Sequence, residues 1–241
     1  MSENLVIIPT YNEINNIAKM VDVVMQLDGG NFDLLIIDDG SPDGTAAIVR
    51  EKMTQYADRI SLIERSGKLG LGSAYIAGFK WALEHNNYNY IFEMDCDFSH
   101  NPEDLVRLRN RARKGADVVV GSRYIKGVNV VNWPMSRLLL SYFASMYVRV
   151  VTRMRVMDAT AGFVCYSRKV LSGIDLDQVK MQGYGFQIEM KYTSIKLGFK
   201  LEELSIIFTE RREGDSKMSG GIFGEALWGV LELPFRRIEG R

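Results

Sequence analysis

Histidine, cysteine and net charge are all scarce in this sequence of 241 residues. It has only two cysteines, Cys96 and Cys165, which suits a reducing compartment and excludes a disulfide-built secreted fold. Its two histidines, His85 and His100, are too few for a histidine-rich zinc site. Because 30 Lys and Arg balance 30 Asp and Glu, the charge gives no reason to expect a nucleic-acid partner.

Long hydrophobic runs and targeting signals are missing as well. No uncharged apolar stretch reaches the roughly 18 residues that a membrane-spanning helix needs, and the run at 138–148 is too short. The N-terminus lacks the basic segment of a signal peptide. The last four residues, 238–241, spell a common engineered protease site, so we set them aside and expect residues 1–237 to form a single domain.

The rest of the sequence alternates short β-branched runs with helical segments. Strands are expected at 5–8, 32–37, 60–63, 90–94 and 118–120, and in the less regular second half at 162–166 and 204–208. Helices are expected from Asn12 to about 27, from Thr45, at 74–83, from Asn101 with Pro102 at its first position, and at 135–152, 185–197 and 221–233. The alternation predicts an α/β fold, a mostly parallel sheet with helices on both faces.

Carboxylates gather where three of these strands end. Asp38 and Asp39 follow the second strand, Asp95 and Asp97 follow the fourth, and Glu13 lies just beyond the first. The carboxyl ends of parallel strands share one edge of the sheet, and ligands bind there in open α/β folds. Carboxylates so close together repel one another unless a cation compensates them. Oxygen ligands of this kind indicate Mg²⁺ or Mn²⁺, held together with substrate phosphates.

Simpler explanations exist for the same residues. An Asp at a strand end is commonly a turn former or a helix cap, and for Asp43 that alternative is as good as a functional one. Asp38 and Asp39 alternatively bind a nucleobase or ribose through charge-assisted hydrogen bonds. The glycines at 67, 70 and 72 do not form the dinucleotide-binding fingerprint, which follows a first strand.

Seven motifs occur in a fixed order along the chain. They are IPTYNE (8–13), DDGSPDGT (38–45), MDCDFSH (94–100), GSRY (121–124), DATAGF (158–163), GYGFQIE (183–189) and ERREGDSK (210–217). In this order they resemble the polyprenol-phosphate sugar transferases of the family 2 glycosyltransferases, with the greatest likeness to the dolichyl-phosphate mannosyltransferases. The resemblance covers almost the whole chain. It implies a nucleotide-diphospho-sugar transferase fold of the A type and an inverting transfer of a hexose to polyprenyl or dolichyl phosphate, with mannose and GDP-mannose as the leading sugar and donor.

The resemblance also implies a role for each site residue. The nucleotide pocket would be lined by Pro9, Tyr11, Glu13 and Asp39. Asp95 and Asp97 would hold the metal on the donor diphosphate, while Arg211 and Lys217 close on it from a loop. Arg123, Arg137 and Ser141 would face the acceptor phosphate, so that Asp97, Arg123, Arg211 and Lys217 form the catalytic set. Ser99 stands where some members carry Gln, so the preference between Mg²⁺ and Mn²⁺ stays open.

A phosphate acceptor also explains why so few bases are present. A phosphomonoester is ionised near neutral pH and attacks without a general base, so neither histidine needs a catalytic role. In the helix expected at 135–152, Arg137, Ser141, Ser145 and Arg149 recur every four residues and share one face. That face could meet the lipid phosphate while the apolar side meets a membrane; the alternative is an ordinary core helix.

We therefore expect a cytoplasmic enzyme bound peripherally to the inner face of a membrane, with a separate membrane subunit as a further candidate partner. Other functions remain open at this stage. One is a family 2 enzyme that uses UDP-glucose, another donor or a hydroxyl acceptor, for which Glu189 is a candidate base. A nucleotidyltransferase would carry a Gly-rich basic loop after the first strand, where this chain has residues 9–13. A catalytically inactive scaffold would have no use for the acidic edge.

Overall fold

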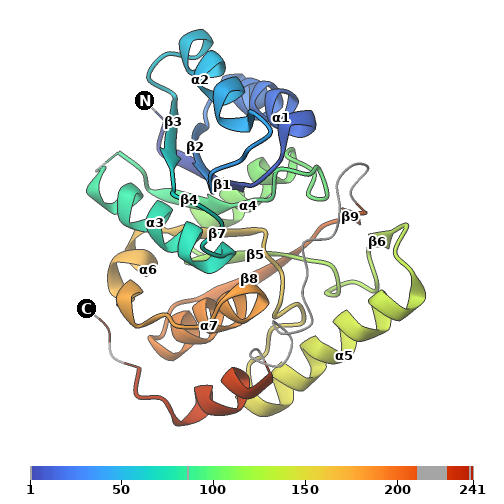
Figure 1. Cartoon of the computed structure of the whole chain (residues 1–241). Coiled ribbons are helices and arrows are strands. Elements are labelled where there is room, and N and C mark those ends of the chain that lie inside the picture. The colour runs from blue at the N-terminus through green and yellow to red at the C-terminus, as the bar shows by residue number, and fades with distance from the viewer. Residues whose placement is uncertain (1, 86, 211–226, 239, 241) are drawn as a thin grey trace.

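A seven-stranded sheet forms the centre of the computed structural model, which describes residues 2–85, 87–210, 227–238 and 240 (Figure 1). The strand order is β3-β2-β1-β4-β7-β5-β8. The strands are β1 (Asn4–Thr10), β2 (Asp33–Asp38), β3 (Ile60–Glu64), β4 (Tyr90–Glu93), β5 (Val118–Ser122), β7 (Val164–Ser167) and β8 (Leu201–Ser205). All neighbouring pairs are parallel except those of β7, which is antiparallel to β4 and β5. The predicted mostly parallel sheet is confirmed.

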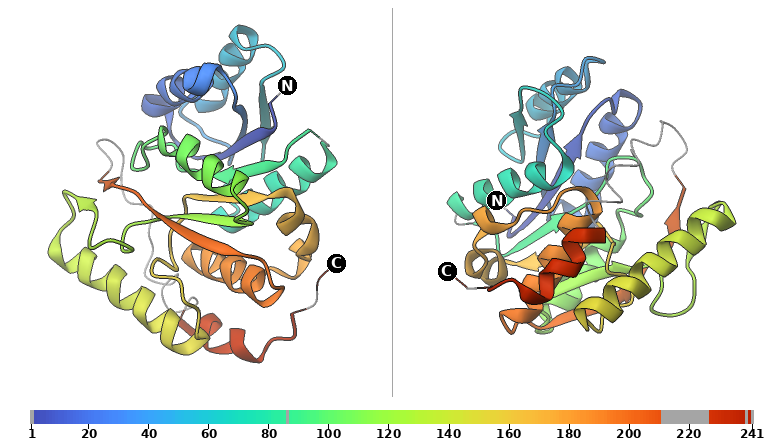
Figure 2. Two further views of the ribbon diagram at one scale, coloured as in Figure 1. Left: turned by 180° about the vertical axis from the view of Figure 1, so that it is seen from behind. Right: turned by 60° about the horizontal axis from the view of Figure 1, so that its bottom comes forward.

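Helices cover both faces of this sheet, as the alternation predicts (Figures 1 and 2). One layer contains α1 (Ile14–Gln26), α2 (Thr45–Gln55) and α4 (Asp104–Arg113), and the other contains α3 (Leu71–Glu84), α6 (Arg168–Gly173) and α7 (Gly183–Lys196). Strand β1 shows how the layers form, because successive side chains of a strand point to opposite faces. Val6 and Ile8 join the first core, Leu5 and Ile7 join the second, and all four are fully buried.

The second half adds a long helix and a small sheet beside the main one. Strand β6 (Val130–Val131) pairs in parallel with β9 (Phe208–Thr209). Helix α5 (Met135–Thr152) begins and ends where the sequence predicts. It lies at the margin of the molecule, and its last turns lie beside a helical segment at 227–232 and the 3-10 helix Leu233–Phe235 (Figure 2). The Tyr147 hydroxyl links the two by donating to the Leu227 carbonyl at 3.0 Å.

Several predicted boundaries need correction. Asn12 does not cap α1; its φ of 56° places it in a left-handed turn, and Glu13 precedes the helix. The Asn101 side chain accepts a hydrogen bond from the Glu103 amide, but α4 begins only at Asp104, after a turn. The strand expected at 204–208 is divided between β8 and β9, and the six-residue α6 is absent from the prediction. The helix expected at 221–233 lies within the described residues only from 227.

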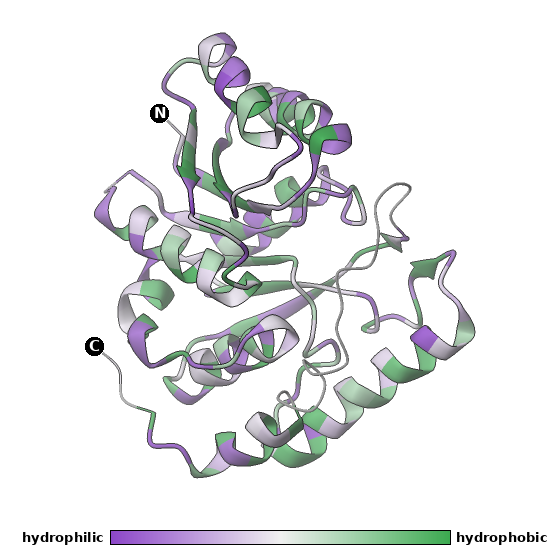
Figure 3. Cartoon of the chain, viewed as in Figure 1, coloured by the Kyte–Doolittle hydropathy of each residue, from purple (hydrophilic) through white to green (hydrophobic). Residues whose placement is uncertain are grey.

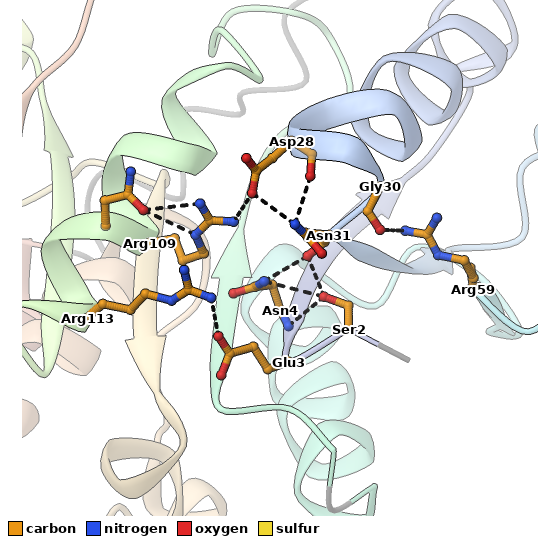
Figure 4. A network of polar contacts seen from close by, with 10 residues as sticks. Ser2, Glu3, Asn4, Asp28, Gly30, Asn31, Arg59, Arg109 and Arg113 are labelled. Carbon is orange, nitrogen blue, oxygen red and sulfur yellow. Dashed lines mark hydrogen bonds and ion pairs between the residues drawn. The ribbon is translucent and has the colours of Figure 1, made fainter.

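A polar network fixes the amino ends of the strands, opposite the acidic edge (Figure 4). Arg113 forms an ion pair with Glu3 just before β1, and Arg109 pairs with Asp28 at 2.5 Å. Arg59 donates to Asp33, the first residue of β2, at 3.1 Å. These contacts hold α4, β1 and β2 together at the amino edge of the sheet. The polar residues at the carboxyl edge are therefore not needed to hold these three elements together.

Candidate active site

A pocket opens at the carboxyl edge of the sheet, where β4 and β5 end. Asp95 and Asp97 line it from the turn after β4, and Arg123 lines it from the segment after β5. Arg137 of α5 lines the same pocket. The structure thus brings the candidate metal ligands together with two of the three candidate acceptor-phosphate residues, although 42 positions separate Asp95 from Arg137 in the sequence.

Asp97 lies between this pocket and a second hollow. The second hollow is lined by Asp97, by Lys19 of α1 and by Thr209 and Glu210 at the end of β9. A tight turn produces this position, since Phe98 has a φ of 59° and the Ser99 amide donates to the Asp97 carboxylate at 3.0 Å. One carboxylate therefore borders both hollows.

The side chains after β4 fit a divalent metal that arrives with its substrate. Among the described residues no three His, Cys, Asp or Glu side chains form a cluster able to hold a metal. Mg²⁺ typically takes one or two carboxylates and completes its shell with substrate phosphates and water, which matches the pair Asp95 and Asp97. Ser99 adds a hydroxyl that is buried, lines the pocket and has no hydrogen-bond partner in the described part of the chain.

The two aspartates at the end of β2 have different roles, since Asp38 shapes a turn and Asp39 forms a buried ion pair. Asp38 accepts hydrogen bonds from Thr10 and from the amide and hydroxyl of Ser41, at 2.6–2.9 Å, so it shapes the turn. Asp43 behaves likewise, accepting from the amides of Ile14 and Thr45. These two follow the simpler explanation for an Asp at a strand end.

Asp39 has a different neighbour. Arg65 contacts its Oδ1 through Nε at 2.6 Å and Nη2 at 2.5 Å, and both side chains are about nine-tenths buried. Arg65 also donates to Ser73 of α3 and to the Gly70 carbonyl. Asp39 is thus part of a charge pair that fixes the loop before α3.

The other candidate nucleotide residues lie at the end of β1. Pro9 ends the strand's buried run, the Lys68 ammonium lies 5.3 Å from the centre of the Tyr11 ring, and Glu13 accepts a hydrogen bond from Asn16. None of Pro9, Tyr11, Glu13 and Asp39 is among the described residues that line the pocket of Asp95. Since β1 lies between β2 and β4, they form an adjoining part of the same edge.

Arg123 is held by a buried carboxylate. Its Nε and Nη2 donate to both oxygens of Asp158 at 2.7 and 2.6 Å, and Nη2 also donates to Thr160 at 3.0 Å. Asp158 is 0% exposed and accepts the Arg123 backbone amide as well. This fork geometry explains the DATAGF motif (158–163), whose acidic residue the sequence left without a role. Arg123 borders the pocket as expected, but part of its hydrogen-bonding capacity serves the fold.

Arg137 and Ser141 differ in their surroundings. Arg137 donates to Glu210 at 2.6 Å and stacks on Trp133, with its guanidinium 4.3 Å from the ring centre. Ser141 accepts a hydrogen bond from the Tyr124 hydroxyl at 2.9 Å and is not among the described residues lining the pocket. Arg211 and Lys217 lie outside the described residues.

Two buried titratable residues, Glu93 of β4 and Lys191 of α7, are a feature that the sequence reasoning missed. Burial raises the pKa of Glu93 to about 8, while burial lowers the pKa of Lys191 to about 8 and Glu93 opposes that shift. The Lys191 ammonium donates to the Ala161 carbonyl at 2.6 Å and to the Gln187 carbonyl at 3.1 Å. Because Ala161 and Gln187 both line the pocket, Lys191 holds part of the pocket wall in place. A charged residue inside the otherwise apolar run of a buried strand was the available signal.

Glu189 and His100, which were both considered from the sequence, are held by contacts within the protein. Glu189, the candidate base for a hydroxyl acceptor, accepts from the amides of Lys180 and Met181 and from Arg236, and it is not among the described pocket residues. His100 does line the pocket, stacked on Phe163 at 4.8 Å, and burial lowers its pKa to about 4.

Comparison with known proteins agrees with this geometry. The profile of the family described as Glycosyl transferase family 2 matches residues 5–174. A protein named polyprenol monophosphomannose synthase, from Mycolicibacterium smegmatis, is 45% identical over 96% of this chain and 87% of its own length. Another, named undecaprenyl-phosphate mannosyltransferase, from Micrococcus luteus, is 43% identical over 94% of this chain and 93% of its own.

A solved structure shares the fold. Glucosyl-3-phosphoglycerate synthase from Mycobacterium tuberculosis, in complex with Mn²⁺, UDP-glucose and phosphoglyceric acid, superposes with a TM-score of 0.72 over 97% of this chain and 80% of the other, at 18% identity. At that identity the likeness concerns the fold alone. The family profile and the two relatives carry more: the chain belongs to glycosyl transferase family 2, and its resemblance to the polyprenol-phosphate sugar transferases of that family is confirmed.

Proposed function

We propose that this enzyme transfers a mannosyl group from GDP-mannose to a polyprenyl phosphate. One observation carries the proposal: Asp95 and Asp97 line the same pocket as Arg123 and Arg137. Carboxylates suit a metal-bound diphosphate, and arginines suit a second phosphate, so the pocket joins two phosphate-binding ends. The names of the two relatives, which specify mannose and a polyprenol or undecaprenyl phosphate, support the same pairing of donor and acceptor.

The chemistry needs no general base on the protein. An oxygen of the acceptor phosphate forms a bond to the anomeric carbon while the bond to the nucleoside diphosphate breaks, which inverts the configuration. The attacking phosphate is already ionised near neutral pH, so no proton has to be removed. This removes the need for a base such as Glu189, whose carboxylate is bound to two backbone amides and Arg236.

The protein's task is to hold two anions close together. A bound divalent cation, Mg²⁺ or Mn²⁺ on Asp95 and Asp97, would stabilise the charge that grows on the leaving diphosphate. Arg137 would neutralise the lipid phosphate, and Trp133 orients the Arg137 guanidinium by stacking on it. Arg123 keeps the pocket wall in place through Asp158 and presents its remaining face to the ligand. Arg211 and Lys217 are proposed to close on the donor, and Pro9, Tyr11, Glu13 and Asp39 to bind the nucleotide.

Helix α5 supports a peripheral position on a membrane, on the cytoplasmic face. Its outward side is apolar, including Leu140, Phe143 and Val150, of which Val150 is 73% exposed (Figure 3). Ser145 on the same helix is instead buried, which is the reverse of the arrangement in an ordinary core helix. Trp228 and Phe235, in the C-terminal segment, are also exposed, at 70% and 90%. No described helix is both long and apolar enough to cross a bilayer.

A donor screen tests the proposal. Purified protein is mixed with a short polyprenyl phosphate, Mn²⁺ or Mg²⁺, and each nucleotide-sugar in turn, and the lipid product is quantified. GDP-mannose should give the fastest turnover, and excess chelator should abolish it. Full activity in chelator would contradict the metal assignment, while turnover with UDP-glucose alone would replace the proposed donor. The absence of any lipid product with every donor would refute the proposed function itself.

A further inference from the structure

Buried polar atoms without partners are concentrated in the proposed active-site pocket. The Tyr75 hydroxyl, the Ser99 hydroxyl, the His100 Nδ1 and the Trp133 Nε1 all belong to residues that line it, and none has a hydrogen-bond partner in the described part of the chain. Tyr75 is 1% exposed and His100 4%. Buried polar groups in folded proteins are nearly always paired, so a cluster of unpaired ones indicates a ligand that completes them.

The position of these atoms identifies which part of the substrate they meet. Asp95 and Asp97 reach the pocket from the turn after β4, and Arg137 reaches it from α5. In a group transfer from a diphosphate to a phosphate, the group between the two anions is the transferred sugar. Ser99 follows the metal ligands directly, and Trp133 stacks against the Arg137 guanidinium. Of these four residues, Tyr75 and His100 are therefore the two not already assigned to either phosphate. Gln187 also lines the pocket with an unpaired Nε2, but its Oε1 already accepts a hydrogen bond from Lys191.

We propose that Tyr75 and His100 bind the hydroxyl groups of the transferred hexose and determine which sugar the pocket accepts. This inference rests on the proposed transferase function. It adds a role for helix α3 and for a histidine that the reaction itself does not require.

The chemistry of the two side chains suits a polyhydroxy group better than a phosphate. Burial, followed by the nearby carboxylates of Asp95 and Glu93, raises the pKa of Tyr75 well above its ordinary value, so its hydroxyl keeps its proton and can donate. Burial lowers the pKa of His100 to about 4, so the neutral ring carries one donor and one acceptor nitrogen. Sugar hydroxyls both donate and accept, whereas a phosphate dianion only accepts.

Packing holds both rings in place. Tyr75 stacks on Phe186 with the ring centres 5.9 Å apart and on Phe79 at 6.2 Å. His100 stacks nearly parallel on Phe163 at 4.8 Å. A fixed polar atom rejects a sugar whose hydroxyl points elsewhere, because the buried group then stays unpaired. Epimers that differ at one carbon should therefore be distinguished here.

Tyr75→Phe is the test, since it deletes one oxygen from a ring that is otherwise surrounded by aromatic packing. Tyr166→Phe is the matched control: its hydroxyl is also fully buried and without a partner in the described chain, but it does not line the pocket. The measurements are calorimetric Kd values for GDP and for GDP-mannose with Mn²⁺, kcat/KM for GDP-mannose and GDP-glucose, and the Tm of the ligand-free protein.

For Tyr75→Phe we expect GDP to bind as before, GDP-mannose to bind about fivefold more weakly, and the preference for mannose over glucose to fall by a similar factor. The ligand-free Tm should stay the same or rise, because an unpaired buried hydroxyl is removed; a structural hydrogen bond would lower it. His100→Phe, which keeps the ring stack, should act in the same direction. Tyr166→Phe should change none of the ligand constants.

The outcomes separate this inference from the function on which it rests. If wild-type protein transfers mannose but Tyr75→Phe and His100→Phe keep its sugar affinity and sugar preference, the inference is wrong and the function stands. If GDP binding weakens as much as GDP-mannose binding, Tyr75 contacts the nucleotide and the inference is again wrong. If the wild-type protein transfers no sugar to lipid phosphate, the proposed function fails first.

Discussion

Glu93 shows what a single buried carboxyl does to the pH dependence of stability. Because burial raises its pKa to about 8, the folded protein keeps a proton that the unfolded chain releases near pH 4–5. The free energy of unfolding should therefore fall as the pH rises from about 5 to 8. Lys191, whose pKa burial lowers to about 8, contributes with the opposite sign only above that pH.

Glu93→Gln tests this directly. Urea denaturation at several pH values between about 5 and 8 should show a smaller decline for the variant than for the wild type, because glutamine does not titrate. Glu64→Gln is the control, since that side chain is 46% exposed and forms only a surface pair with Arg50. Parallel pH curves for Glu93→Gln and the wild type would contradict the assigned pKa shift.

Arg137 is the residue best suited to test acceptor binding. Arg123 is less suitable, because replacing it also disrupts the buried Asp158 and so confounds activity with folding. Arg137→Ala should raise the KM for the lipid phosphate about tenfold or more, as expected for the loss of a charged hydrogen bond, and should leave GDP affinity unchanged.

The control for Arg137→Ala lies on the same helix. Arg149→Ala removes the same charge three turns away and should leave the lipid KM as it is. If both variants keep wild-type acceptor kinetics, the lipid phosphate binds elsewhere. If both raise the KM equally, the effect is a general attraction to an anionic surface and not a phosphate contact.

At the scale of elements, α5 is built the opposite way to a core helix. Its buried residues are Ser145, Val148 and Thr152, and its larger apolar side chains face outward. Phe143→Glu should reduce sedimentation with anionic lipid vesicles by severalfold, because it adds a negative charge to a face of low polarity. Stability should change by no more than about 0.5 kcal/mol, since Phe143 is 53% exposed.

Gln55→Glu provides the comparison for Phe143→Glu. It adds the same charge at an exposed position on α2, away from α5, and should leave vesicle binding unchanged. Equal losses for the two variants would show that net charge and not α5 governs the association. No loss for Phe143→Glu would place the membrane contact on another surface.

Elements marked by a contiguous run of residues could be predicted from the sequence, whereas features that depend on residues far apart in the chain could not. Short apolar runs predicted β1 to β5, because each of these strands forms its own continuous signal, and the limits of α5 were predicted exactly. The direction of β7 was not predictable, since an antiparallel return strand has the same apolar run as a parallel one. The Arg123–Asp158 pair was hidden for a related reason: its partners are 35 residues apart, and only the tertiary fold brings them together.

At the scale of the whole molecule, an ion pair with a buried glutamate is one of the contacts that attach the C-terminal segment to the core. Arg236 donates to Glu189 of α7 at 2.6 Å, and the Glu189 side chain is only 5% exposed. Arg236→Ala should lower the free energy of unfolding by about 1.5–3 kcal/mol, the range for a hydrogen bond to a charged group. Chemical denaturation measures this loss, and limited proteolysis should show faster cleavage near residue 236.

Glu232→Ala separates the two partners of Arg236. Glu232 contacts Arg236 only at the surface, at 3.3 Å, so its removal should cost no more than about 0.5–1 kcal/mol. Equal costs for the two variants would mean that the buried contact with Glu189 contributes little. The expected difference would identify this pair as the attachment of the C-terminal segment.

The antiparallel direction of β7 affects which segments of the chain can line the pocket. The parallel strands end at the carboxyl edge of the sheet. Strand β7 runs the other way, so it begins there, and the residues just before Val164 lie at this edge. This edge therefore contains the segment that precedes β7 as well as the segments that follow the parallel strands. Residues 158–162 can face those that follow β5 across the width of a single strand, without a crossover helix between them. A change in the length of α6 or of the loop after β7 would accordingly be felt at the far edge and not in the pocket.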